Sequence, residues 1–234
     1  MGTFITNITQ IFQTHGLAFL QASLLTIQIT AISLIFAVVI GLIFAFFKIS
    51  DSKLLHRIAD AYITLIRGTP LIVQLMFLYY GISSVITLND FTAGALALGI
   101  HSGAYIAEIF RGAIQSIDKG QMEAARSLGM PYPLAMRRII FPQALKRAIP
   151  PLGNQFIIGL KDSALVAYIG ATELFNTALS AQGENYMPFE TYFVVGMYYL
   201  ILVLIFTFIL NKIEARLDIR QGKSKNVQSE VKAA

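Results

Sequence analysis

Long apolar runs without ionisable side chains limit what this chain can fold into. Residues 17–47 contain no Lys, Arg, Asp or Glu, and several later runs are nearly as apolar. A helix needs roughly 20 apolar residues to cross a bilayer. Only 13% of the chain is charged, about half the share typical of a soluble domain. The sequence therefore predicts an all-α integral membrane protein that crosses the membrane several times.

The placement of basic residues predicts the topology. Seventeen of the 18 Lys and Arg residues lie in three groups, at 48–67, 111–147 and 212–232. Because cytoplasmic loops concentrate Lys and Arg, all three groups are expected inside. Five crossings satisfy this condition, with the N-terminus outside and the C-terminus in the cytoplasm. The expected crossings are residues 17–47, 70–88, 91–114, 148–169 and 191–210.

A single transmembrane domain is expected over residues 1–220, followed by a polar cytoplasmic tail at 221–234. Residues 48–67 carry apolar side chains at intervals of three and four, which predicts an amphipathic helix on the inside. The third crossing is rich in Gly and Ala. Small residues let transmembrane helices approach closely, so this helix is expected at the centre of the bundle.

Several kinds of chemistry are missing from the sequence. The chain has no Cys, and His15, His56 and His101 are too scattered for a metal site. There is no Gly-rich phosphate loop that ends in Lys-Ser or Lys-Thr, and no catalytic triad can be assembled. We therefore expect no metal or cofactor in this chain and no enzymatic activity. The grouped positive charge indicates topology, so nucleic acid is not an expected partner.

The longest inside segment, residues 117–147, contains a short predicted helix. This helix covers Gln121 to Leu128, with Asp118 just before it and Gly129 and Pro131 just after it. An acidic residue favours the start of a helix, and Gly followed by Pro favours its end. So short a helix between two crossings is either a solvated connector or a surface that docks into a groove of another protein.

The inside segment has a motif made of Glu123, Ala124, Ala125, Gly129, Ile139 and Pro142. In residue types and spacing it resembles the EAA loop of permeases from binding-protein-dependent ABC importers, although Phe141 stands where that family usually has Leu. The resemblance implies the type I ABC importer permease fold, in a bacterial cytoplasmic membrane. It also implies that Glu123, with Arg126 beside it, contacts a separate ATPase.

The assembly that this resemblance implies has several partners. Two permeases, identical or related, would combine with two ATPases on the cytoplasmic side and an extracytoplasmic solute-binding protein. The ATPases would bind ATP and Mg, and the binding protein would meet the loop at 171–190. Lipid and an amino acid substrate complete the expected partners.

Three further motifs lie along the chain. The first runs from Arg67-Gly68-Thr69-Pro70 to Gln74, and the second from Gly103-Ala104-Tyr105 to Glu108 and Arg111. The third begins at Pro150-Pro151 and includes Asn154, Lys161, Asp162 and Ser163. With the EAA loop they cover residues 67–170 in the expected order and resemble polar amino acid permeases. The chain is thus identified as a member of the polar amino acid importer family. Its predicted function is that of the membrane-spanning permease subunit of an ATP-driven amino acid importer.

Two of these motifs are candidates for the translocation path. Gly68 and Pro70 favour a bend, which is either purely structural or part of a gate. Glu108 and Arg111 are neighbours on one helical face, and they form either an ion pair or part of an aqueous path. The candidate gate and path residues are Arg67, Gly68, Thr69, Pro70, Gly103, Tyr105, Glu108 and Arg111.

The fourth crossing holds ionisable groups, which within a membrane usually mark a pathway or a substrate site. Asp162 can take the ammonium group of an amino acid; the alternative is a pair with Lys161. Related importers of cationic amino acids can carry an acid at position 155, so the neutral Gln155 predicts a neutral polar substrate such as glutamine or cystine. The candidate substrate-binding residues are Gln74, Asn154, Gln155, Asp162 and Ser163.

Two other functions remain open. A secondary amino acid transporter driven by an ion gradient commonly has repeated halves, and no repeat is visible here. A non-transporting membrane scaffold that recruits an ATPase would not depend on Gln155 or Asp162 for uptake. ATP-dependent uptake separates the importer from both.

Overall fold

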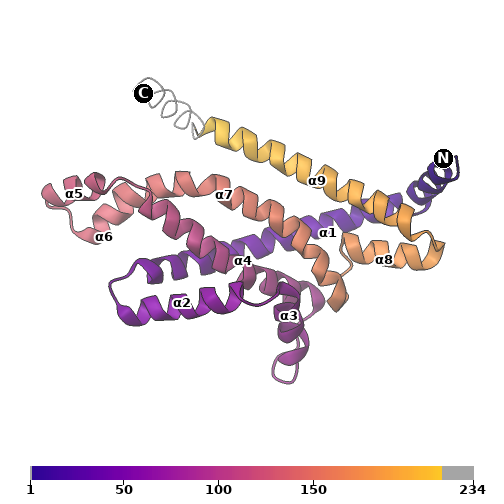
Figure 1. The fold of residues 1–234 in the computed structure, drawn as a ribbon, viewed down its shortest axis with the longest axis horizontal. Helices are drawn as coiled ribbons and strands as arrows, with labels where there is room; N and C mark the ends of the chain where they lie inside the picture. The colour runs from indigo at the N-terminus through magenta and orange to yellow at the C-terminus, as the bar shows by residue number, and fades with distance from the viewer. Residues whose placement is uncertain (1, 218–234) are drawn as a thin grey trace.

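The computed structural model describes residues 2–217, and every regular element in that range is helical (Figure 1). The protein is an elongated bundle in which the long helices run roughly side by side. The chain turns at both ends of this bundle and also nearer its middle, around α3 and before α8 (Figure 1). The tail expected at 221–234 lies outside the described residues.

The first helix, α1 (Gly2–Ile49), has 48 residues. At 1.5 Å per residue it is about 70 Å long, more than twice the thickness of the hydrocarbon core of a bilayer. It begins well before residue 17, where the first crossing was expected. Its N-terminal part lies beside α8 (Leu174–Asn185) and α9 (Pro188–Arg216) at one end of the bundle (Figure 1).

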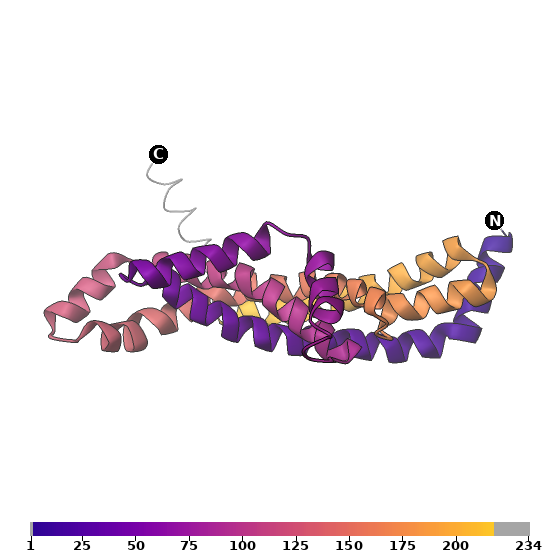
Figure 2. The same ribbon diagram turned by 90° about the horizontal axis from the view of Figure 1, so that it is seen from below.

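The next two helices form one bent unit. After a turn at Ser50–Ser52, α2 (Lys53–Arg67) returns along α1, and α3 (Leu71–Met76) then leaves at 103° from it (Figure 2). A π-helical turn, η1 (Phe77–Gly81), continues α3. The expected second crossing at 70–88 is thus helical only to Gly81, and the helix expected over 48–67 forms the other half of a broken element.

The fourth helix, α4 (Asp90–Gln115), is the centre of the bundle, as its Gly and Ala content predicted. Of its most apolar stretch 67% is buried, against 33% for α1 and 17% for α9. Its glycines permit this contact. A Cβ added to Gly99 would lie 2.9 Å from the Cβ of Phe36 and 3.2 Å from the carbonyl oxygen of Ser33.

The remaining elements connect α4 to α9. They are α5 (Lys119–Ser127), α6 (Tyr132–Ala135), the π-helical turn η2 (Met136–Ile140), α7 (Phe141–Asp162) and the 3-10 helix η3 (Ser163–Ile169), followed by α8. Both α5 and α6 project from the end of the bundle that also holds the α1–α2 turn (Figure 1). The C-terminal end of α9 points toward the same end (Figure 1). Each of the three basic groups therefore has residues toward this end, although Arg67 lies at the other end of α2, at the bend.

Within residues 2–217, three helices are long and apolar enough to cross a membrane: α1, α4 and α9. A fourth crossing is available if the bent pair of α2 and α3 counts as one. Among the remaining helices, π-helical and 3-10 segments interrupt the regular α-helical geometry, and α7 contains Pro150 and Pro151. The count of five crossings therefore stays a prediction, whereas the all-helical class is confirmed.

Candidate functional site: the projecting loop and the translocation path

The projecting helix α5 has well-defined ends. The side chain of Asp118 accepts a hydrogen bond from the backbone N–H of Gly120 at 2.7 Å, which caps the start. At the other end, Met130 N–H donates to the carbonyl of Ala125 at 3.1 Å and Gly129 N–H to that of Arg126 at 2.9 Å. These two bonds with Gly129 at φ 81° form a Schellman motif. The sequence signals for both ends of this helix are therefore confirmed.

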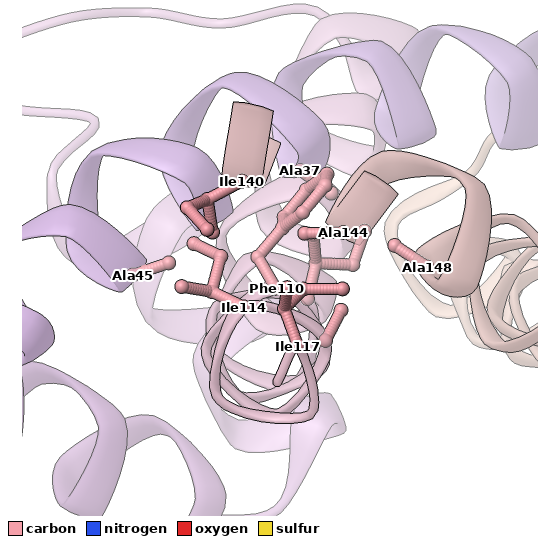
Figure 3. Packing of buried hydrophobic residues seen from close by; sticks show 10 residues of the cluster. Ala37, Ala45, Phe110, Ile114, Ile117, Ile140, Ala144 and Ala148 are labelled. Carbon is pink, nitrogen blue, oxygen red and sulfur yellow. The ribbon is translucent and has the colours of Figure 1, made fainter. Parts of the chain in front are cut away.

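One face of α5 packs against the bundle. Ala125 is 2% exposed, and Met122 packs against a cluster that includes Ile114, Ile117 and Ile140. Figure 3 shows this cluster gathering side chains from α1, α4, η2 and α7 at the base of the loop. Because the base is packed, α5 is held in a fixed position rather than left as a solvated connector.

The opposite face of α5 is open. Glu123, Ala124 and Arg126 are exposed, and the side chain of Leu128 is 83% exposed. Only one of the paired alanines, Ala124, therefore belongs to the outer face, and no local signal in the sequence predicts that Ala125 turns inward. Leu128 was not singled out from the sequence, yet it is the most prominent apolar side chain at the tip.

The loop is also held by hydrogen bonds where the chain returns to the bundle at α7. Arg147 of α7 donates to the carbonyl and the hydroxyl oxygen of Ser116, just after α4. Pro142 lies exposed at the start of α7, directly after the π-helical turn η2. The segment 117–147 is thus a rigid protrusion with an exposed tip.

The bend between α2 and α3 is built from the predicted Arg67–Pro70 motif. A Cβ at Gly68 would lie 2.7 Å from the carbonyl oxygen of Thr64, so the close turn requires glycine. Pro70 is the N-cap of α3, in extended conformation. The guanidinium carbon of Arg67 lies 5.1 Å from the ring centre of Tyr105 on α4. Gly103 faces Tyr62, whose hydroxyl donates to the carbonyl of Ile100 at 2.6 Å.

Glu108 and Arg111 form the ion pair that was one of the two alternatives. The Nε and Nη2 atoms of Arg111 lie 2.9 and 2.6 Å from Oε2 of Glu108. Arg111 also donates through Nη1 to Gln115. The pair belongs to the half of α4 that leads to the projecting loop, and a role of these residues in the path stays a prediction.

The predicted substrate residues lie in three elements, α3, α7 and η3, and differ in their exposure. Gln155 is 7% exposed and its amide lies 3.4 Å from the hydroxyl of Ser102 on α4. Ser163 is fully buried and donates to the carbonyl of Leu160. Asn154 is exposed and Asp162 half-buried. Among residues 2–217 no ion pair joins Asp162 to Lys161.

Gln74, the fifth predicted substrate residue, lies in α3 apart from the α7 residues. Its amide nitrogen donates to the carbonyl of Ile66 at 2.8 Å and to the hydroxyl of Thr69 at 2.7 Å. Its amide oxygen lies 3.0 Å from Nδ1 of His101. His101 was expected to be a scattered polar residue, and its contact with Gln74, 27 positions earlier in the chain, has no signal in the sequence.

A buried carboxylate beside the middle of α1, at the start of α8, was also missed. Glu173 is completely buried and caps α8, with its carboxylate accepting hydrogen bonds from the N–H of Asn176 and the hydroxyl of Tyr199, both at 2.8 Å. The hydroxyl of Thr26 accepts from the N–H of Leu174 at 3.1 Å. Elements α1, α8 and α9 therefore meet at this group. Burial raises the pKa of the Glu173 carboxyl above its ordinary value.

These features define an all-helical subunit with helices long and apolar enough to cross a membrane and with a protruding loop around α5. The chain belongs to the family described as binding-protein-dependent transport system inner membrane component, whose sequence pattern matches residues 37–219. It is an ABC transporter permease of the polar amino acid importer type, the membrane subunit of an ATP-driven amino acid importer.

Two of its relatives are named as amino acid permeases. The glutamine transport system permease protein GlnP of Escherichia coli strain K12 is 38% identical over 203 residues, covering 86% of this chain and 93% of GlnP. The arginine transport system permease protein ArtQ of Bacillus subtilis strain 168 is 38% identical over 217 residues, covering 92% of this chain and 96% of ArtQ.

Solved structures agree with this assignment. A crystal structure of an amino acid ABC transporter with histidines superposes with a TM-score of 0.82 at 41% identity, covering 88% of this chain and 96% of that one. The MetNI methionine ABC transporter in an inward facing conformation gives a TM-score of 0.73 at 21% identity, over 85% of this chain and 95% of that one. At that identity the second match shows the fold alone.

Proposed function

We propose that the chain pairs with a second permease and is energised by two ATPases that dock on α5. The observation that carries this proposal is the exposed face of α5, with Glu123, Ala124 and Leu128, on a protrusion whose base is packed. A fixed apolar and charged tip suits a groove on a partner because little conformational freedom is lost on docking. ATP and Mg are bound by the ATPases, and this chain has no catalytic activity of its own.

The orientation follows from the charge distribution. The end of the bundle that carries α5 and the basic groups faces the cytoplasm, according to the enrichment of Lys and Arg in cytoplasmic loops. The N-terminus and α8 then lie on the outer side of a bacterial cytoplasmic membrane. An extracytoplasmic solute-binding protein delivers the substrate there, at the loop around residues 171–190.

The substrate is a neutral polar amino acid such as glutamine or cystine. Asp162 receives its ammonium group, with Asn154, Gln155 and Ser163 supplying neutral hydrogen-bonding groups. Support comes from the half-buried position of Asp162, which forms no ion pair with Lys161 among residues 2–217, since a cationic partner favours a carboxylate that is partly removed from water. GlnP, named for glutamine, supports a neutral substrate, whereas ArtQ, named for arginine, favours a cationic one.

Competition uptake tests the choice of substrate. The permease is reconstituted in proteoliposomes with its ATPase and binding protein, and uptake of labelled glutamine is measured with unlabelled competitors. Cystine and glutamine should compete better than arginine. Stronger transport of arginine than of either neutral amino acid would contradict the proposal. Asp162→Asn should abolish uptake while the complex still assembles, and unchanged uptake would favour the scaffold function instead.

A further inference from the structure

The bend between α2 and α3 is held by a small polar network on α4. Taking the transport function proposed above, we infer that His101 is a positioning residue: its ring N–H orients the amide of Gln74, and this amide caps the broken end of α2. The contact keeps the two halves of the broken element at the 103° bend seen here. Gln74 then serves as part of a conformational lock rather than as a substrate ligand.

The break in the helix creates a need for hydrogen-bond donors. The last carbonyl groups of a helix have no partner within it, and an unpaired carbonyl is costly at membrane depth. The N–H of Gly68 donates a hydrogen bond to the carbonyl of Thr64 at 2.9 Å, and the hydroxyl of Thr69 donates one to the carbonyl of Leu65 at 2.8 Å. The carbonyl of Ile66 receives its hydrogen bond from the side chain of Gln74, eight residues on.

The Gln74 amide can do this in only one orientation. If it were flipped, its oxygen would face the carbonyl of Ile66 and the two acceptors would repel. Nδ1 of His101 lies 3.0 Å from the amide oxygen of Gln74. Since this oxygen can only accept, Nδ1 carries the proton. The ring thus selects the orientation in which the amide nitrogen faces Ile66.

The network also fixes both sides of the break to one rigid helix. His101 and Tyr105 are one turn apart on α4, with ring centres 5.3 Å from each other. Tyr105 lies under Arg67 before the break, and His101 binds Gln74 after it. Because α4 is the most buried of the long apolar helices, it can act as a fixed support against which the bend is held.

An adjoining pocket gives the bend room to change. It has a volume of about 410 Å³ and is almost wholly apolar, and its walls come from both halves of the broken element and from α4, including Leu65, Phe77 and Ile100. A polar contact beside an adaptable apolar space is the arrangement expected of a hinge with two states.

Four variants, three single and one double, test this role by transport. His101→Leu removes the donor, whereas His101→Asn keeps an N–H close to the position of Nδ1. We expect His101→Leu to lower the maximal uptake rate about tenfold with a KM within about twofold of wild type. His101→Asn should restore most of the rate. Gln74→Met should lose as much as His101→Leu, and the double variant should lose no more than either.

Matched substitutions on α1 serve as controls. His15→Leu and Gln10→Met change the same residue types far from the bend and should behave as wild type. Four outcomes would each overturn the role of His101 as a positioning residue. The first two are equal losses of rate for His101→Leu and His101→Asn, or wild-type rates for both. The other two are additive losses in the double variant, or a raised KM with an unchanged rate.

A distance measurement tests the lock without transport. The chain has no Cys, so Leu54→Cys and Val85→Cys, both at strongly exposed positions, can carry a pair of spin labels across the bend. In complexes with one labelled permease, His101→Leu should broaden or shift the distance distribution and His101→Asn should restore it. An unchanged distribution in His101→Leu would overturn the inference. A wild-type chain that transports no amino acid would instead contradict the proposed function.

Discussion

Gly129 shows how a single residue can set the geometry of the docking protrusion. Its φ of 81° is in the left-handed region, and a Cβ placed there would meet nothing within 4 Å. The requirement for glycine is therefore conformational and not steric. An L-residue in this region costs about 1–2 kcal/mol.

Gly129→Ala should therefore lower the stability of the end of α5 by about 1–2 kcal/mol and weaken binding of the ATPase. The measurement is the affinity of the reconstituted permease for its ATPase, together with hydrogen exchange at Met130, whose N–H closes the helix end. Gly183→Ala is the matched control, because Gly183 lies in α8 with no contact within 4 Å and no positive φ. Equal effects of the two substitutions would contradict this account.

Glu173 leads to a prediction about pH. Its pKa is raised by burial in the folded protein, whereas an unfolded Glu titrates near 4.3. The neutral carboxyl is favoured by folding, so its contribution to stability is complete below about pH 4.3. This contribution is lost as the pH rises through the folded pKa.

Glu173→Gln stays neutral and should lack this loss. The melting temperature of the wild type, relative to that of Glu173→Gln in the same detergent, should fall as the pH rises from about 4 to neutral. Glu190→Gln, at a half-buried position at the start of α9, is the control. A difference between wild type and Glu173→Gln that is constant with pH, or that grows in favour of wild type at high pH, would show that the carboxylate is the stabilised form.

At the scale of elements, the contact between α1 and α4 is the main packing surface of the bundle. Gly99 faces α1 so closely that an added Cβ would crowd the Cβ of Phe36 and a backbone oxygen. Gly112, on the same helix, has open space at that position. We expect Gly99→Ala to destabilise the protein by about 1–3 kcal/mol and Gly112→Ala to be neutral or stabilising, because Ala favours helix over Gly.

Thermal unfolding of the two variants in detergent tests this pair. Gly99→Ala should melt below wild type and Gly112→Ala at or above it. A melting temperature for Gly99→Ala that equals that of Gly112→Ala would mean that α1 and α4 do not meet as closely as described.

Some elements follow from the sequence because their signals are local. The apolar runs predict α1, α4 and α9, the Gly and Ala content predicts that α4 is central, and the cap residues Asp118 and Gly129 predict the ends of α5. Each of these depends on residues that are close in the chain. Gly68 and Pro70 predict the bend at residues 68–70 for the same reason, whereas its role in a gate stays a prediction.

Other features depend on neighbours from distant parts of the chain. The position of α2 along α1, the inward turn of Ala125, and the contact of His101 with Gln74 are decided by packing between elements. Glu173 and Tyr199 are 26 residues apart. Periodicity and composition carry no information on such pairs, so the candidate site could be predicted at its loop and only in part along its path.

At the scale of the whole molecule, the bundle has two ends joined by long helices. The α5 protrusion lies at one end, and the α8–α9 turn with the start of α1 lies at the other (Figure 1). In the proposed transporter, movement imposed on α5 by the ATPases reaches the path through α4 and α7, which share the apolar cluster at the base of the loop. Transport then depends on the exposed face of α5, even though no substrate touches it.

The most direct test is uptake in proteoliposomes that contain the permease, its ATPase and its binding protein. We predict that the wild type accumulates the amino acid with ATP on the α5 side and no ion gradient, and that Leu128→Asp reduces this accumulation at least about tenfold, as expected when a charge replaces an apolar side chain at the centre of an interface. Accumulation that needs an ion gradient but not ATP, or that is unaffected by Leu128→Asp together with Glu123→Ala, would contradict a permease energised through α5.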